Sequence, residues 1–161
     1  MSQHLEIDPR GPRLTATLTT VLLAVVLVTA PSPLAVVLLA IQTVLFAVGA
    51  LAGVSRTPYA WLFRNVVRPR LEAPVELEDA TPPRFAQAVG LVFAVVALGG
   101  YLSGAALLGS IATGLALAAA FLNAAFGFCL GCELFLVLRR IVPAPQHHHP
   151  IENNRAGHPV A

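Results

Sequence analysis

The sequence contains no lysine, and only 11% of its residues are charged, whereas about 25% are charged in a typical soluble protein. Hydrophobic residues make up 57% of the chain. A chain of 161 residues with this composition has no stretch left over for a separate soluble enzyme domain. The composition therefore predicts an integral membrane protein whose surroundings are the lipid bilayer.

The ten basic residues are all arginine, and they avoid the two short turns between apolar runs. Because basic residues close to spanning segments stay cytoplasmic, we expect a multi-pass protein of the cytoplasmic (inner) membrane with both termini and the central loop in the cytoplasm. Acidic residues share the same segments and no basic run reaches motif length, so we expect no nucleic-acid partner. The arginines are Arg10, Arg13, Arg56, Arg64, Arg68, Arg70, Arg84, Arg139, Arg140 and Arg155.

Four uncharged apolar runs predict an all-α membrane protein with transmembrane helices at about 14–30, 34–54, 85–101 and 105–127. At a rise of about 1.5 Å per residue, these lengths suit a hydrocarbon core about 30 Å thick. The first run lacks a small-residue cleavage site, so we expect it to be retained. Residues 1–142 are then one four-helix transmembrane domain, and 143–161 are expected to be a disordered cytoplasmic tail.

Two further segments, 57–68 and 128–140, are expected to lie along the membrane surface. The first begins with Thr57-Pro58, a favourable helix start, and combines aromatic side chains with arginines. The second follows from length, because the apolar stretch 105–138 would reach about 51 Å as one straight helix, against about 30 Å of hydrocarbon. Either the fourth span tilts strongly, or it ends near Gly127 and the rest of the chain bends along the interface. The internal repeat described next favours the bend near Gly127.

An internal repeat relates the two halves of the chain. The segment Asp8-Pro9-Arg10-Gly11-Pro12-Arg13 matches Asp79-Ala80-Thr81-Pro82-Pro83-Arg84 at an offset of 71. This predicts two parallel helical-hairpin repeats, each followed by a short cytoplasmic interfacial helix, related by a pseudo-twofold axis along the membrane normal. The alternative is chance similarity between two helix starts. The spacing of Gly49 and Gly53 allows close approach of another helix, which is compatible with a homo-oligomer.

The only two cysteines form a Cys-x-x-Cys pair, Cys129 and Cys132, followed directly by Glu133. Two thiols at this spacing can close a disulfide, or one can attack while the other resolves the mixed disulfide. We take Cys129 as nucleophile, Cys132 as resolving thiol and Glu133 as proton relay. The alternative is that the thiols pack as small apolar residues while Glu133 reaches the interface or pairs with a basic side chain.

Two other features of the dithiol follow from its surroundings in the sequence. A permanent structural disulfide is not expected on the reducing side of the membrane. A zinc site is not expected either, because zinc needs four ligands and the nearest histidine is His147.

Asn123 and Gln42 are the polar residues expected deep in the bundle. They either hydrogen-bond between helices or, together with Arg64 and Arg139, line a small-molecule pocket that faces the cysteines. Positive potential from neighbouring arginines would favour a thiolate. The sequence names no cofactor for such a pocket.

Five motifs resemble one known family, domain of unknown function 4395, which comprises small integral membrane proteins of bacteria. The resemblance covers about residues 5–142, and the family's thioredoxin-like and sulfurtransferase neighbours imply thiol or sulfur chemistry with a soluble partner of that kind. The motifs are Asp8-Pro9-Arg10-Gly11-Pro12-Arg13, Ser55-Arg56-Thr57-Pro58-Tyr59, Val67-Arg68-Pro69-Arg70-Leu71, Pro82-Pro83-Arg84-Phe85-Ala86-Gln87 and Phe126-Gly127-Phe128-Cys129-Leu130-Gly131-Cys132-Glu133.

Two hypotheses about function remain open at this point. In the first, the protein is a membrane thiol-disulfide oxidoreductase or sulfur-transfer component that exchanges electrons or sulfane sulfur with a soluble cytoplasmic thiol or sulfurtransferase partner. In the second, it is a non-enzymatic transporter component, channel or membrane scaffold in which the cysteines only pack. Thiol trapping in intact cells separates the two hypotheses.

Overall fold

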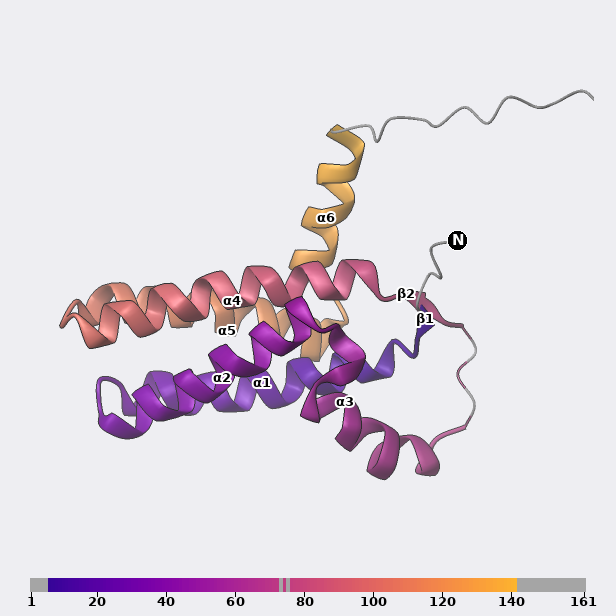
Figure 1. The fold of residues 1–161 in the computed structure, drawn as a ribbon, viewed down its shortest axis with the longest axis horizontal. Coiled ribbons are helices and arrows are strands. Elements are labelled where there is room, and N and C mark those ends of the chain that lie inside the picture. The colour runs from indigo at the N-terminus through magenta and orange to yellow at the C-terminus, as the bar shows by residue number, and fades with distance from the viewer. Residues whose placement is uncertain (1–5, 73, 75, 142–161) are drawn as a thin grey trace, which may run out of the picture.

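The computed structural model describes residues 6–72, 74 and 76–141, so the tail 143–161 with its three consecutive histidines lies outside the described residues. Four helices are long and apolar enough to cross a membrane: α1 (Arg10–Thr29), α2 (Pro33–Leu51), α4 (Thr81–Leu102) and α5 (Ala106–Phe126). They lie lengthwise beside one another (Figure 1). The prediction of an all-α chain with four helices long and apolar enough to span a membrane is confirmed.

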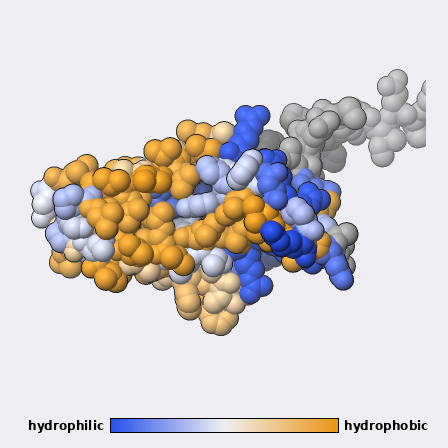
Figure 2. Space-filling model, turned by 90° about the horizontal axis from the view of Figure 1, so that it is seen from below, coloured by the Kyte–Doolittle hydropathy of each residue, from blue (hydrophilic) through white to orange (hydrophobic). Residues whose placement is uncertain are grey.

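Two tight turns lie at one end of this bundle, one between α1 and α2 and one between α4 and α5 (Figure 1). Ser32 caps α2 by accepting a hydrogen bond of 3.3 Å from the backbone N–H of Ala35. Hydrophobic residues cover most of the length of the bundle, whereas strongly hydrophilic residues gather at the opposite end (Figure 2). The surface is therefore apolar along most of the bundle and strongly polar at one end.

The four long helices pack in a fixed set of pairs. Helix α1 lies against α5, α2 against α4, and α4 also against α5. Outside this contact zone, large apolar side chains such as Val28 and Leu107 are 86% and 75% exposed, as expected for residues that face lipid. The buried cluster at the centre comprises Leu23, Val26, Ala35, Leu39, Phe46, Ala94, Ala97, Tyr101 and Ala112.

The hydrophilic end carries a short antiparallel pairing of β1 (Glu6–Ile7) with β2 (Glu78–Asp79). Ile7 lies opposite Glu78, and each strand leads into a long helix. The carboxylate of Asp8 accepts the backbone N–H of Arg10 at 3.0 Å, and that of Asp79 accepts the N–H of Thr81 at 2.8 Å. Because the first N–H groups of a helix have no intrahelical partner, these aspartates stabilise the starts of α1 and α4.

Two arginines at these helix starts hold the far ends of other helices. Arg13 of α1 donates to the carbonyls of Ala124 and Ala125 at 3.1 and 3.2 Å, in the last turn of α5. Arg84 of α4 donates to two consecutive carbonyls in the last turn of α2, at 2.7 and 2.8 Å. A cation at a helix C-terminus stabilises the unpaired carbonyls and the helix dipole.

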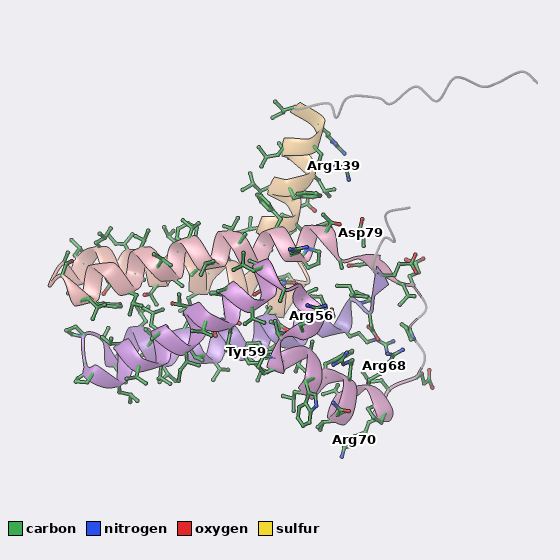
Figure 3. All side chains as sticks on the ribbon, in the orientation of Figure 1. Arg56, Tyr59, Arg68, Arg70, Asp79 and Arg139 are labelled. Carbon is green, nitrogen blue, oxygen red and sulfur yellow. A yellow bond between two sulfur atoms is a disulfide. The ribbon has the colours of Figure 1, made fainter. Side chains whose placement is uncertain are left out.

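Short helices follow α2 and α5 at the hydrophilic end. After α2 come η1 (Val54–Arg56), α3 (Pro58–Leu62), the π-helical η2 (Phe63–Val67) and η3 (Arg68–Arg70); after α5 comes α6 (Leu130–Ile141). Helix α6 and the α3 segment leave the bundle in opposite directions, and α6 stands roughly across the long helices (Figure 1). The labelled arginines Arg56, Arg68, Arg70 and Arg139 lie on or beside these segments (Figure 3).

One of the two glycines noted for close helix approach is already used within the chain. A Cβ added at Gly49 would lie 2.9 Å from the Gln87 side chain of α4. Gly49 therefore lets α2 and α4 pack closely within one chain. This contact accounts for the glycine without a second copy of the chain.

Candidate functional site

The dithiol begins at the point where α5 ends. Gly127 has φ 69°, in the left-handed region that favours glycine, and its N–H donates to the Asn123 carbonyl at 3.0 Å. The N–H of Phe128 reaches back to the carbonyl of Leu122 at 3.3 Å. Together these bonds form a helix C-terminal cap of the Schellman type. The chain therefore turns sharply out of the bundle just before Cys129, near the residue where the sequence predicts a bend.

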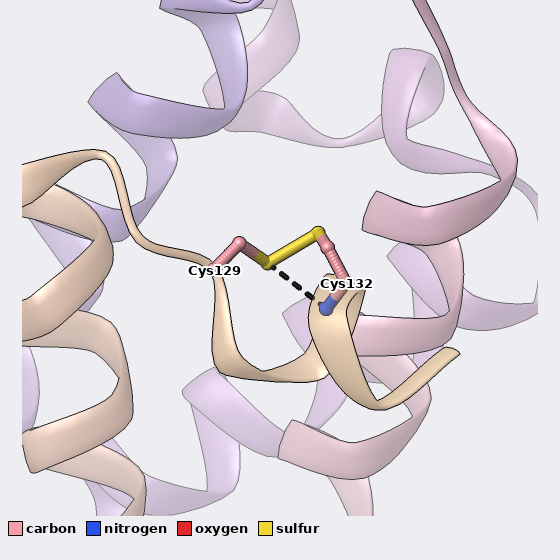
Figure 4. Close-up of a disulfide and its surroundings, with 2 residues drawn as sticks. All are labelled: Cys129 and Cys132. Atoms are coloured by element: carbon pink, nitrogen blue, oxygen red, sulfur yellow. Dashed lines mark hydrogen bonds between the residues drawn. A yellow bond between two sulfur atoms is a disulfide. The ribbon is translucent and has the colours of Figure 1, made fainter. Parts of the chain in front are cut away.

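Cys129 is the capping residue of α6. The backbone N–H of Cys132 donates to Cys129 Sγ at 3.3 Å, and the N–H of Glu133 donates to the Cys129 carbonyl at 3.0 Å. The two cysteines are joined by a disulfide with their Cα atoms 5.2 Å apart (Figure 4). The sulfur atom of Cys129 thus occupies the position that a serine or aspartate oxygen occupies at other helix starts.

This placement favours negative charge on the sulfur of Cys129 when the pair is reduced. Helix α6 has 12 residues, with Glu133 in its first turn and Arg139 and Arg140 in its last turn. A helix N-terminus presents unpaired N–H groups and the positive end of the dipole. Such a position generally lowers the pKa of a cysteine thiol and makes it more reactive.

Gly131, between the two cysteines, fixes the distance from α6 to α4. A Cβ added at Gly131 would lie 2.6 Å from the Cβ of Ala86 and 2.7 Å from its Cα. These separations are far shorter than an ordinary carbon contact of about 3.5–4.0 Å. The first turn of α6 therefore rests directly on the backbone of α4, and glycine is the residue that permits this approach.

A cavity of about 400 Å³ opens beside the dithiol and is lined by both cysteines. Near the cysteines its wall carries polar groups of Arg10, Arg13, Glu78 and Asn123. Farther into the bundle the wall is formed by apolar and small residues: Ala16, Phe46, Gly90, Phe93, Ala116, Ala119 and Ala120, with Thr15, Thr19 and Gln87 as the polar exceptions. Cys129 and Cys132 are half-buried in this wall and do not belong to the packed core.

The structure brings together only part of the predicted pocket. Asn123 lines the dithiol cavity. Gln42 is buried and joins three helices, because its amide donates to Thr19 Oγ1 at 3.4 Å and its Oε1 accepts the Tyr59 hydroxyl at 3.1 Å. Burial raises the pKa of Tyr59 above its ordinary value of 10.0. Gln42 thus makes interhelical hydrogen bonds, the first of the two roles considered for it in the sequence.

The two arginines proposed for the pocket lie elsewhere. Arg64 lines a second cavity of about 320 Å³, which shares Pro12, Thr15, Pro83 and Gln87 with the first. Arg139 stacks over the ring of Phe135 within α6, with its guanidinium carbon 5.8 Å from the ring centroid. Glu133 is exposed on the first turn of α6.

Sequence reasoning missed Arg13, although a signal for it was present. Arg13 lines the dithiol cavity and holds the end of α5 from which the cysteine segment departs. It stands at the offset of 71 from Arg84, so the repeat marked both arginines as a pair. The repeat does not predict that Arg13 contacts α5, because α1 and α5 are far apart in the sequence.

No metal site is found in the part of the chain that the structure describes. Among residues 6–72, 74 and 76–141, no three His, Cys, Asp or Glu side chains lie close enough together to hold a metal ion.

These observations define a class of protein: a membrane protein with four helices of spanning length, whose dithiol caps a helix and lines a cavity at the hydrophilic end. The model of one family, described as a domain of unknown function (DUF4395), matches residues 7–140, and the chain belongs to that family. The resemblance inferred from the motifs is thereby confirmed. No curated protein and no solved structure matches the chain.

Proposed function

We propose that this protein exchanges electrons or sulfane sulfur with a soluble cytoplasmic thiol or sulfurtransferase partner through Cys129 and Cys132. The observation that carries the proposal is the cap of α6, in which the Cys132 N–H donates to Cys129 Sγ at 3.3 Å. A hydrogen bond to the charged form of a group favours that form, so the cap supports Cys129 as the attacking thiolate.

The exchange with a thiol partner is a two-electron reaction in two steps. The Cys129 thiolate attacks a partner disulfide, forms a mixed disulfide and releases one partner thiolate. Cys132 then attacks Cys129 Sγ, closes the intramolecular disulfide and releases the second partner thiolate, so that the partner gains two electrons and the dithiol loses two. The Cα separation of 5.2 Å suits this ring closure.

For a sulfurtransferase partner the same thiolate accepts a sulfur atom. Cys129 would attack the terminal sulfur of a partner persulfide, leaving the partner as thiolate and Cys129 as persulfide, with no net change in electron count. Attack of Cys132 on Cys129 Sγ would then release the sulfur as hydrosulfide. Glu133, exposed in the first turn of α6, would take the proton lost by the Cys132 thiol.

The orientation in the membrane is also a proposal. We place the hydrophilic end with the dithiol in the cytoplasm, because the arginines of the central segment and of α6 lie there and the two opposite turns carry no charged residue. Reporter fusions at Ser32 and Ser103 should report the outside, and a fusion at Glu76 the inside. The reverse pattern would move the dithiol to the oxidising side.

We further propose that the fold consists of two repeats of a hairpin with an interfacial helix. Three pairs of residues at the offset of 71 support it: Asp8 and Asp79 accept the first N–H of a long helix, Arg13 and Arg84 hold helix ends, and Ile7 pairs with Glu78. In the first copy Thr57 Oγ1 caps α3 as Cys129 Sγ caps α6. The dithiol then belongs to one copy only.

Mixed-disulfide trapping tests the thiol function. With Cys132→Ser, Cys129 keeps its cap but the resolving thiol is lost, so we expect adducts with soluble proteins that are sensitive to reductant to accumulate. With Cys129→Ser, the matched control, such adducts should be absent. The hypothesis of cysteines that only pack predicts no adduct in either variant and no labelling by a thiol reagent in cells. That result would remove the redox function in favour of a transporter component, channel or scaffold.

A further inference from the structure

The dithiol cavity reaches much deeper than a reaction with a soluble partner requires. Thr19 lies nine residues inside the start of α1, and Ala116 ten residues before the end of α5. At about 1.5 Å per residue, both lie roughly 14–15 Å from the helix ends, close to half of a hydrocarbon core of about 30 Å. The cavity therefore connects the cysteines with the middle of the bilayer.

The lining of the cavity changes with depth. Two phenylalanines and four alanines form much of the inner wall, and the ring of Phe46 covers Gly90, where an added Cβ would lie 2.8 Å from the ring. Near the cysteines, the side chains of Arg13 and Asn123 can donate hydrogen bonds to an oxygen atom. Such a wall fits a molecule with a flat apolar body and carbonyl oxygens at its polar end.

The chemistry of the dithiol selects one class among such molecules. The exchange with the soluble partner is reversible, and in the reverse direction a partner dithiol gives two electrons to the Cys129–Cys132 disulfide and leaves it reduced. The reduced dithiol then needs a second redox partner that takes these two electrons and returns it to the disulfide. In a cavity within the membrane that partner must dissolve in lipid and carry two electrons with two protons. Quinones combine these properties with a flat ring and two carbonyl oxygens, and about 400 Å³ lies within the usual range of about 300–1,000 Å³ for small-molecule sites.

We propose that the cavity binds the ring of a membrane-soluble quinone, which oxidises the dithiol. The inference rests on the proposed function and names the second redox partner of that site. In the reaction, Cys129 and Cys132 lose two electrons and two protons as the S–S bond forms. Each of the two quinone oxygens gains one proton, and the ring gains the two electrons, giving a quinol and the disulfide.

The test uses the full chain, purified in detergent, reduced and freed of reductant. A quinone with a short alkyl chain is added, and quinone absorbance is followed together with the number of free thiols. We expect one quinol for each disulfide formed and no reduction of quinone by Cys129→Ser. Diamide, a small soluble thiol oxidant, serves as a parallel oxidant that needs no binding site.

Variants of α5 separate occupation of the cavity from general damage. Ala120 lines the cavity, whereas Ala118 is exposed on the outside of the same helix. Ala120→Phe should slow quinone reduction by about tenfold or more, equivalent to about 1.4 kcal/mol. Ala118→Phe should leave the rate unchanged, and neither variant should change oxidation by diamide. If Ala120→Phe does not fold, Ala119→Leu fills the same wall with a smaller side chain.

The outcomes distinguish this inference from the function on which it rests. If diamide oxidises the dithiol and Cys132→Ser traps a partner, but the quinone does not react, the quinone site is refuted and the thiol function stands. Equal rates for the Ala120→Phe and Ala118→Phe variants would also refute the site. If the cysteines fail to react with diamide and trap no partner, the thiol function itself is wrong.

Discussion

Replacement of Gly131 by alanine is the sharpest test of how the dithiol is positioned. The added Cβ would lie 2.6 Å from the Cβ of Ala86 and 2.7 Å from its Cα, about 1 Å closer than an ordinary contact. Because one of the two atoms belongs to the backbone of α4, no change of rotamer relieves the overlap. Overpacking of this kind costs about 1–3 kcal/mol, and the first turn of α6 must move away from α4.

The movement should be felt at the sulfur atom. The hydrogen bond from the Cys132 N–H to Cys129 Sγ is 3.3 Å long, so a displacement of the turn weakens it directly. A hydrogen bond to a charged group contributes about 1.5–3 kcal/mol, and about 1.4 kcal/mol corresponds to a factor of ten in an equilibrium. We therefore expect about tenfold less Cys129 thiolate near neutral pH in the Gly131→Ala variant.

The assay is the rate of alkylation of Cys129 in a Cys132→Ser background, which leaves one thiol and keeps the backbone N–H of residue 132. Gly114→Ala in α5 is the control, because a Cβ there meets no atom within 4 Å. The reasoning fails if the Gly131→Ala and Gly114→Ala variants alkylate at the same rate over the whole pH range. A slower rate in Gly131→Ala at low pH that converges with the control at high pH would confirm a loss of thiolate.

Three more predictions follow from contacts described above. Arg13→Gln and Arg84→Gln should each lower stability by about 1 kcal/mol in thermal melts. Only Arg13→Gln should change the alkylation rate of Cys129, because only Arg13 holds the end of α5. Equal effects of the two variants on this rate would contradict the role of Arg13. Gln42→Leu should cost about 1–3 kcal/mol, since it leaves the hydroxyls of Thr19 and Tyr59 without their partner, and an unchanged melting temperature would argue against the network. Because the pKa of folded Tyr59 is raised, the stability it contributes is complete below pH 10.0 and is lost as pH rises through the folded pKa, so the alkaline loss of stability should be smaller in Tyr59→Phe; identical profiles would refute this.

The fold could be predicted from the sequence as far as hydrophobic length decides it. Four apolar runs and the turn residues between them indicate four helices of spanning length, and the structure has them. The helix α1 starts at Arg10, before its apolar run, because the Asp8 carboxylate accepts the first N–H of the helix, and a charged first turn at the hydrophilic end costs little. The sequence does not predict which helices pack against each other, because each apolar run has apolar residues on all sides and no distinct face for a particular neighbour.

The site could be predicted in part for the same reason. The Cys-x-x-Cys spacing and its place after the fourth apolar run are local features, and both cysteines meet at one cavity wall. Asn123 could be predicted to line the cavity because it is a polar residue in an apolar run. Arg64 and Arg139 were expected near the dithiol because they are close to membrane ends, but side-chain direction on a short helix decides where they point, and composition does not contain that information.

The cap formed by Cys129 couples two equilibria that are usually separate. The same sulfur atom that would gain or lose charge also holds the first turn of α6. By thermodynamic reciprocity, the helical form of α6 stabilises the Cys129 thiolate by the same coupling free energy with which the thiolate stabilises the helix, so a contact that favours the helix also favours the thiolate up to that amount. The apolar residues of α6 are largely exposed, among them Ile141 at 70%. Docking of α6 on a lipid surface would thereby tune the acidity of the thiol.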